Sequence, residues 1–129
     1  MVVFDTESLL LFYLDEEGAP VVEEWLGRVI QGAVQGWLSV VNLTELYYIL
    51  YRRDAAIAEE KIRNLNAYGL QIVQPQDAIW RKAGVIKAMH AIPLADAFAA
   101  ATAQVKEDQL LVGRDDDFDD LDVPLIRVR

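Results

Sequence analysis

The chain has 129 residues, of which 53% are hydrophobic and 26% charged; this is enough apolar material for a folded core and argues against intrinsic disorder. It contains no cysteine, which excludes disulfides, thiolate metal sites and cysteine nucleophiles and is consistent with a reducing compartment. Its net charge of −9 disfavours a domain that binds nucleic acid by charge neutralisation, although divalent cations can mediate contact with a phosphodiester.

The amino-terminal segment lacks the features of an export or membrane sequence. Its longest apolar run, LLLFYL, is short and follows Asp5 and Glu7 rather than basic residues. No repeat, low-complexity tract or Gly/Ser/Pro-rich linker interrupts the chain. We therefore expect a cytoplasmic protein without a membrane segment, folded as a single domain over residues 1–129.

Short apolar runs alternate along the chain with segments of helical spacing. The apolar runs predict buried strands at 2–4, 37–41, 70–73, 110–112 and 124–128. The segments between them predict helices at 7–14, 18–34, 43–66, 76–89 and 93–106. The last helix opens with Pro93, a favoured first-turn residue. This alternation predicts an α/β three-layer sandwich, with a central, mostly parallel sheet of four or five strands and helices on both faces.

Carboxylates stand where the chain passes the carboxyl end of the predicted sheet, the edge at which α/β proteins bind ligands. Asp5 follows the first strand directly, and Glu45 follows the second by a few residues. Asp96 lies in the first turn of the helix at 93–106, and Asp115 comes just after the fourth strand. No other polar residue type recurs at these positions, so these four acids form the candidate site.

Each acid also has a purely structural explanation, and the sequence leaves both explanations open. Asp5 can cap the helix that follows it. Asn42 and Glu45, three residues apart, resemble a capping box. Asp96 can interact favourably with the amino terminus of its own helix. Its surroundings, PLADAFAAATA, are so apolar that an unpaired carboxylate would be costly there, which favours a cation.

Six aspartates crowd the segment LLVGRDDDFDDLD at 110–122. An EF-hand loop beginning at Asp115 would need glycine where Asp120 stands and glutamate where Ile126 stands, so that kind of site is excluded. A charge run is usually a solvated turn, which we expect for most of these residues. Asp115, nearest the strand, is the best ligand candidate, and Asp117 is the second.

The chemistry of these side chains points to a hard cation. Clustered carboxylates raise one another's pKa and become stable at neutral pH when a dication lies among them. Ligation by oxygen alone suits Mg²⁺ or Mn²⁺. His90 is the single histidine and is expected on the surface, and no dinucleotide-binding, Walker or GxSxG motif occurs. Arg114 either meets a phosphate or pairs with neighbouring acids. The residues therefore predict a divalent-cation site suited to phosphodiester chemistry.

In order and spacing, the acidic segments resemble those of the PIN domain, especially the small VapC-type toxins of prokaryotic toxin–antitoxin pairs. The segments are VVFDT, VVNLTEL, PLADAFAAATA and LLVGRDDDF, and the similarity covers essentially the whole chain. The resemblance implies an endoribonuclease that depends on Mg²⁺, with Mn²⁺ as an alternative, and a sheet order of 3-2-1-4-5. It also implies an RNA substrate, a cognate antitoxin that covers the site, and a homodimer.

The resemblance carries over an acidic quartet that holds the metal and performs catalysis, namely Asp5, Glu45, Asp96 and Asp115. Asp117 would be a further metal ligand, and Thr6 would support the site from its place beside Asp5. Two positions depart from the family. Glu7 stands where Ser or Asn is common, and Gly113 stands where Thr or Ser is common, so an acid is added and a hydroxyl is removed. Both departures bear on activity and metal affinity.

Two other functions stay open at this stage. A catalytically silent PIN-like module would use the apolar surface of the helices at 18–34 and 43–66 to bind a partner helix. A phosphotransfer domain would use Asp5 as the phosphoacceptor. The phosphotransfer reading is the weaker one, because the segment DTES lacks a second aspartate and no lysine follows the fourth or fifth strand.

Overall fold

The computed structural model describes residues 1–114 and 116–128. Five strands form one sheet in the order β3-β2-β1-β4-β5, and every neighbouring pair is parallel. The strands are β1 (Val2–Phe4), β2 (Gly36–Ser39), β3 (Gln71–Val73), β4 (Gln109–Val112) and β5 (Leu125–Arg127). The predicted α/β class, the parallel sheet and the strand order are confirmed.

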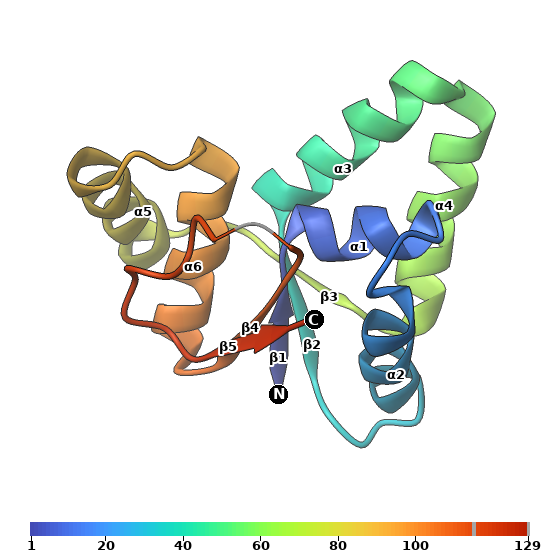
Figure 1. Cartoon of the computed structure of the whole chain (residues 1–129), viewed down its shortest axis with the longest axis horizontal. Helices are drawn as coiled ribbons and strands as arrows, with labels where there is room; N and C mark the ends of the chain where they lie inside the picture. The colour runs from blue at the N-terminus through green and yellow to red at the C-terminus, as the bar shows by residue number, and fades with distance from the viewer. Residues whose placement is uncertain (115, 129) are drawn as a thin grey trace.

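Two helices fill each of the first three connections between strands. They are α1 (Thr6–Tyr13), α2 (Ala19–Ile30), α3 (Val40–Arg53), α4 (Ala55–Tyr68), α5 (Asp77–Met89) and α6 (Leu94–Lys106). Helices α1 to α4 cover one face of the sheet, and α5 and α6 cover the other, on the right and left of Figure 1 respectively. Within the described ranges, no helix has both the length and the apolar character needed to cross a bilayer.

The burial of β1 explains this layered arrangement. Val2 and Phe4 pack into the core beneath α1–α4, whereas Val3, between them, packs into the core beneath α5 and α6. All three side chains are fully buried. A strand that is apolar on both faces belongs inside a sheet covered by two helical layers, and β1 lies between β2 and β4. The carboxyl end of β1 is therefore at the middle of the sheet edge.

The prediction of one helix at 43–66 is wrong, because α3 and α4 are separate helices that meet at Asp54. Asp54 has an extended backbone, with φ −167° and ψ 118°. Its side chain accepts hydrogen bonds from the amides of Ala56 and Ile57, at 2.9 and 3.2 Å. The cap of a new helix cannot keep helical dihedrals, so Asp54 ends α3 as it begins α4.

The strand predicted at 37–41 ends earlier than expected, at Ser39. Ser39 Oγ accepts the N–H of Val41 at 3.2 Å, so the two valines after Ser39 already belong to α3. Asn42 is thus inside the helix rather than at its cap, and the predicted capping box is wrong. Pro93 is likewise the N-cap residue of α6 rather than its first helical residue.

Candidate metal centre at the carboxyl edge of the sheet

Asp5 leaves β1 at the middle of the sheet edge and begins α1. Its backbone N–H donates to the carbonyl of Leu111 in β4 at 3.2 Å, so strand pairing holds it in place. Its Oδ1 accepts the N–H of Ser8 at 2.7 Å, which makes Asp5 the N-cap of α1, as one of its two predicted roles requires. Asp5 is only 1% exposed, and its Oδ2 accepts no hydrogen bond of standard geometry from the described residues. One carboxylate oxygen caps a helix, and the other can take a further partner.

The surroundings of Asp5 disfavour its negative charge. Burial raises the pKa of its carboxyl from 3.8 to about 7. The hydrogen bonds from Ser8 lower this pKa, the negative charge of Glu7 raises it, and the backbone N–H of Gly113 lowers it. A divalent cation stabilises the ionised form of a carboxylate that it contacts. Asp5 therefore fits the ligand of a hard cation, because burial destabilises its charge and its Oδ2 takes no part in the helix cap.

A buried amide joins the starts of three helices at this edge. Asn42, in the first turn of α3, is fully buried. Its Nδ2 donates to Thr6 Oγ1 in α1 at 3.0 Å and to the carbonyl of Ala95 in α6 at 3.2 Å. Thr6 Oγ1 donates in turn to the backbone carbonyl of Asn42 at 3.3 Å. Since Thr6 adjoins Asp5 and Ala95 adjoins Asp96, this network fixes the relative position of the two segments that carry those acids.

Glu45 and Asp96 lie beside this network. Glu45 is half-buried one turn after Asn42 and lines a groove together with Leu94 and Ala95 at the start of α6. Asp96 follows in the first turn of α6 and is also half-buried. The rest of that helix is buried around much of its circumference, as its alanine-rich sequence predicted. Figure 1 shows the starts of α1, α3 and α6 at the same end of the sheet.

The acidic segment after β4 is largely exposed. Asp117 lies exposed on the loop between β4 and β5. The other described aspartates of this loop are exposed as well, namely Asp116, Asp119, Asp120 and Asp122. Phe118, in their midst, is fully buried and anchors the loop to the core. This exposure agrees with a solvated turn. Asp115 lies outside the described residues.

Residues 1–114 and 116–128 contain no group of three acidic or histidine side chains that could hold a metal ion by themselves. The predicted quartet includes Asp115, which is not described, so its convergence on one ion stays a prediction. The structure brings together the backbone segments that carry the other three members, through the network of Asn42.

Arg114 and His90, the weaker candidates, have structural roles. The guanidinium of Arg114 lies 3.4 Å from the carboxylate of Glu16, so it pairs with an acid, one of the two predicted alternatives. His90 is the half-buried C-cap of α5, and its backbone N–H donates to Ile86. His90 is therefore less exposed than the surface position expected from the sequence.

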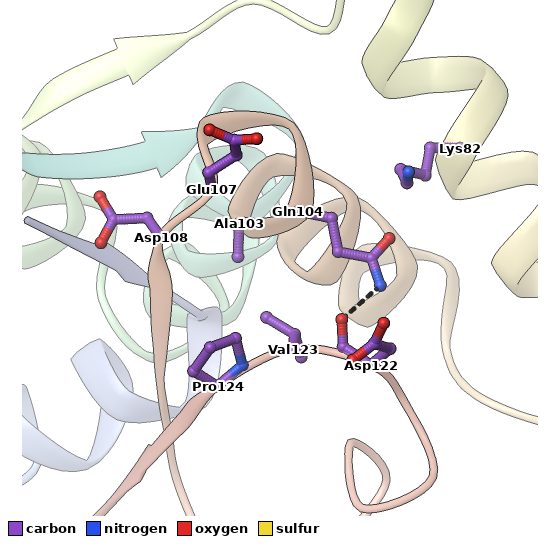
Figure 2. Close-up of a pocket in the computed structure, with 8 residues that line it drawn as sticks. All are labelled: Lys82, Ala103, Gln104, Glu107, Asp108, Asp122, Val123 and Pro124. Atoms are coloured by element: carbon purple, nitrogen blue, oxygen red, sulfur yellow. Dashed lines mark hydrogen bonds between the residues drawn. The ribbon is translucent and has the colours of Figure 1, made fainter.

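A second acidic pocket lies at the opposite edge of the sheet, between the end of α6 and the starts of β4 and β5 (Figure 2). Glu107, Asp108 and Asp122 line it, together with Lys82. Asp108 is a buried acid, 8% exposed, which the sequence analysis did not single out. Its carboxylate points away from that of Asp122, and Gln104 Nε2 donates to the backbone carbonyl of Asp122 at 3.0 Å (Figure 2). The acids of this pocket do not converge, and we assign no site to it.

The fold defines a parallel α/β domain with acidic side chains at the carboxyl ends of its strands, the edge at which such domains bind ligands. The sequence model of the PIN domain matches residues 2–124, nearly the whole chain. The chain belongs to the PIN domain family.

Solved structures of prokaryotic toxin–antitoxin proteins share this fold. A toxin–antitoxin complex from Klebsiella pneumoniae matches with a TM-score of 0.74 and 18% identity, covering 100% of this chain and 98% of that one. VapBC2 from Rickettsia felis, bound to a DNA fragment from its promoter, matches with a TM-score of 0.76 and 14% identity, covering 98% of both chains. VapC20 from Mycobacterium tuberculosis, a toxin that cleaves the sarcin–ricin loop, matches with a TM-score of 0.72 and 14% identity, covering 95% of this chain and 96% of that one. No curated protein sequence matches.

The network around Asn42 generates a stability prediction. Asn42→Ala removes both hydrogen bonds of Nδ2 and leaves the carbonyl of Ala95 buried without that donor, so the free energy of unfolding should fall by about 2–3 kcal/mol. Urea denaturation followed by circular dichroism measures it. The matched control is Thr44→Ala, which removes an exposed hydroxyl of the same helix and should cost no more than about 0.5 kcal/mol. Equal losses in the two variants would contradict the assigned role.

The raised pKa of Asp5 generates a pH prediction for the metal-free protein. Because the folded state holds this proton up to a pKa of about 7 and the unfolded state releases it near 3.8, the free energy of unfolding should fall as pH rises through this window. The upper limit of the loss is about 4 kcal/mol.

Asp5→Asn keeps a side-chain acceptor for Ser8 and cannot ionise. This variant should lose the decline between pH 4 and 7 and be the more stable protein at pH 8, without added metal. Thermal unfolding in a series of buffers measures both proteins. Parallel pH profiles for the two would show that Asp5 is not the group responsible.

Proposed function

We propose that this PIN domain is an endoribonuclease of the VapC toxin type that depends on Mg²⁺ or Mn²⁺. The observation that carries the proposal is the carboxylate of Asp5, which is buried at the centre of the sheet edge, has a pKa raised to about 7 and uses only Oδ1 for the helix cap. Retaining a charge-bearing group in such a place is costly for stability, and coordination of a cation offsets that cost.

In this proposal the metal is held by the acidic quartet with the help of Asp117. The quartet consists of Asp5, Glu45, Asp96 and Asp115. A bound Mg²⁺ or Mn²⁺ supplies a nucleophilic water at neutral pH and stabilises the charge that develops on the phosphodiester. The protein holds Asp5 by the N–H of Ser8, and Thr6 positions the segment through its hydrogen bonds with Asn42.

The proteins that share the fold support the proposed partners. VapC20 is a toxin that cleaves the sarcin–ricin loop, and several of the matching structures are toxin–antitoxin complexes, which supports an RNA substrate and a cognate antitoxin for this chain. We include in the proposal a single domain over residues 1–129, a homodimer and a cytoplasmic location. A net charge of −9 disfavours the binding of a polyanionic substrate. A cation held at the site would offset this repulsion locally, because it would supply the positive charge that the phosphate needs.

The proposal predicts that Asp96→Asn loses RNA cleavage while the fold persists. Replacing a metal-binding carboxylate by a neutral amide of the same shape should lower the cleavage rate at least about 100-fold. A panel of RNA hairpins that includes the sarcin–ricin loop, incubated with Mn²⁺ and resolved on denaturing gels, measures the rate.

Asp120→Asn is the matched control, since it makes the same change on the exposed loop and should cleave at the parent rate. Circular dichroism and the melting temperature verify that both variants are folded. Cleavage by Asp96→Asn at the control's rate would refute the assignment of this residue.

A catalytically silent interaction module is the second candidate. It is favoured by apolar side chains that remain exposed along the α3–α4 hairpin, among them Tyr48 (43%), Tyr51 (54%) and Ile57 (45%). Calorimetric titration with Mn²⁺ separates the two functions. The nuclease should bind the ion with a dissociation constant in or below the millimolar range, and Asp5→Asn should weaken that binding, whereas absence of binding in the parent protein supports the silent module.

A further inference from the structure

The side chain of Glu7 links the start of α1 to the segment that follows β4. It lies in the first turn of α1, two residues after Asp5, and its side chain is half-buried. Its Oε1 accepts the backbone N–H of Arg114 at 3.0 Å, just beyond the end of β4. The same arginine reaches Glu16 with its guanidinium. The start of α1 is therefore tied to the exit of β4 by a side chain as well as by the sheet.

Gly113 provides the space that Glu7 occupies. A Cβ on residue 113 would lie 2.5 Å from Cγ and 2.7 Å from Oε1 of Glu7, closer than non-bonded atoms can approach. The backbone of Gly113 is not in the left-handed region, which among the described glycines is found at Gly18, Gly32 and Gly69. A side chain at 113 would therefore displace the Glu7 carboxylate, so the place that Glu7 occupies depends on the glycine.

This contact bears directly on Asp5. The backbone N–H of Asp5 donates to Leu111 at 3.2 Å, and the backbone N–H of Gly113 acts on the Asp5 carboxyl and lowers its pKa. Gly113 stands between Leu111 and Arg114, so a bond that fixes the amide of Arg114 also restricts where the N–H of Gly113 lies relative to Asp5.

We propose that Glu7 is a positioning residue of the acidic site: its carboxylate, seated over Gly113 and bonded to the amide of Arg114, holds the exit of β4 in register with Asp5. The two departures from the family pattern then form one unit, in which the acid at position 7 depends on the glycine at position 113. The inference rests on the proposed metal-dependent function only for its effect on cation binding.

Amide hydrogen exchange of the full chain, resolved by NMR, tests the contact without any metal. In Glu7→Ala the amide of Arg114 should exchange about tenfold faster, as expected for loss of a hydrogen bond to a charged acceptor. The amide of Val2, which donates to the carbonyl of Gln35 at 2.9 Å at the other end of β1, is the internal reference and should change by less than about twofold. Glu7→Gln keeps an oxygen acceptor and should restore slow exchange at Arg114.

Gly113→Ala tests the dependence on glycine. Its methyl group displaces the Glu7 carboxylate, so the amide of Arg114 should exchange as fast as in Glu7→Ala. The double variant Glu7→Ala/Gly113→Ala should be no faster than Glu7→Ala alone, because the space is already vacated. Additive effects of about 100-fold in the double variant would overturn the dependence, since independent changes multiply. Unchanged exchange in Glu7→Ala would overturn the contact itself.

Mn²⁺ titration of the same proteins tests the effect on the site. Glu7→Ala and Gly113→Ala should each weaken Mn²⁺ binding by about fivefold. Glu7→Gln should stay within about twofold of the parent protein, because its side chain loses the charge but keeps the oxygen that accepts the amide of Arg114. A loss in Glu7→Gln equal to that in Glu7→Ala, or no loss in Glu7→Ala, would overturn the positioning role. If the parent protein binds no Mn²⁺, the proposed nuclease function fails, and the exchange pattern alone then decides whether Glu7 holds the two segments together.

Discussion

Because β1 lies between two parallel neighbours and beneath helices on both faces, the chain has to leave this strand inside the protein. Asp5 is the first residue after the strand, so its carboxylate is buried by the topology of the sheet. The N–H groups of Ser8 and Gly113 offset only part of the cost of burying this carboxylate. What remains is a carboxyl group with a raised pKa at the edge where parallel sheets bind ligands, which is the physical basis of the proposed metal centre.

The strands and their parallel sheet could be predicted from the sequence, because fully buried parallel strands are short apolar runs and the helices between them repeat at three and four residues. The strand order came from the resemblance to the PIN domain and not from these patterns. The break between α3 and α4 could not be predicted in this way. Leu50 and Ala58 are buried on either side of Asp54, so apolar residues recur at helical spacing across the break. Only the side chain of Asp54, which bonds to the amides of Ala56 and Ile57, ends one helix and starts the next.

The positions of Asp5, Glu45 and Asp96 near the carboxyl edge could be predicted in outline, since these acids follow the ends of strands or begin a helix, whereas their joint binding of a cation stays a prediction. The contacts that support the site could not be foreseen, because they join segments far apart in the chain. The capping-box pattern made Asn42 a candidate helix cap. Its spacing of four and eight residues from Leu46 and Leu50 instead indicates a position on the buried face of α3, as the structure shows. In the sequence, Glu7 and Gly113 are two separate departures from the family pattern. Only the structure shows that the side chain of Glu7 fills the space that a side chain at position 113 would need.

The exposed aspartates that follow β4 place negative charge beside the carboxyl edge of the sheet. Phe118 fixes the loop to the core, so Asp116 and Asp117 on its amino-terminal side stay close to the exit of β4, whereas Asp122 lies at the opposite edge of the sheet. For the RNA substrate that we propose, the repulsion would reach about one Debye length, roughly 8 Å at physiological ionic strength. Monovalent salt would shorten that range and quicken the encounter, the opposite of the slowing that salt causes for basic nucleic-acid-binding proteins. If the proposed nuclease function holds, this low rate of encounter restrains the activity without any inhibitor.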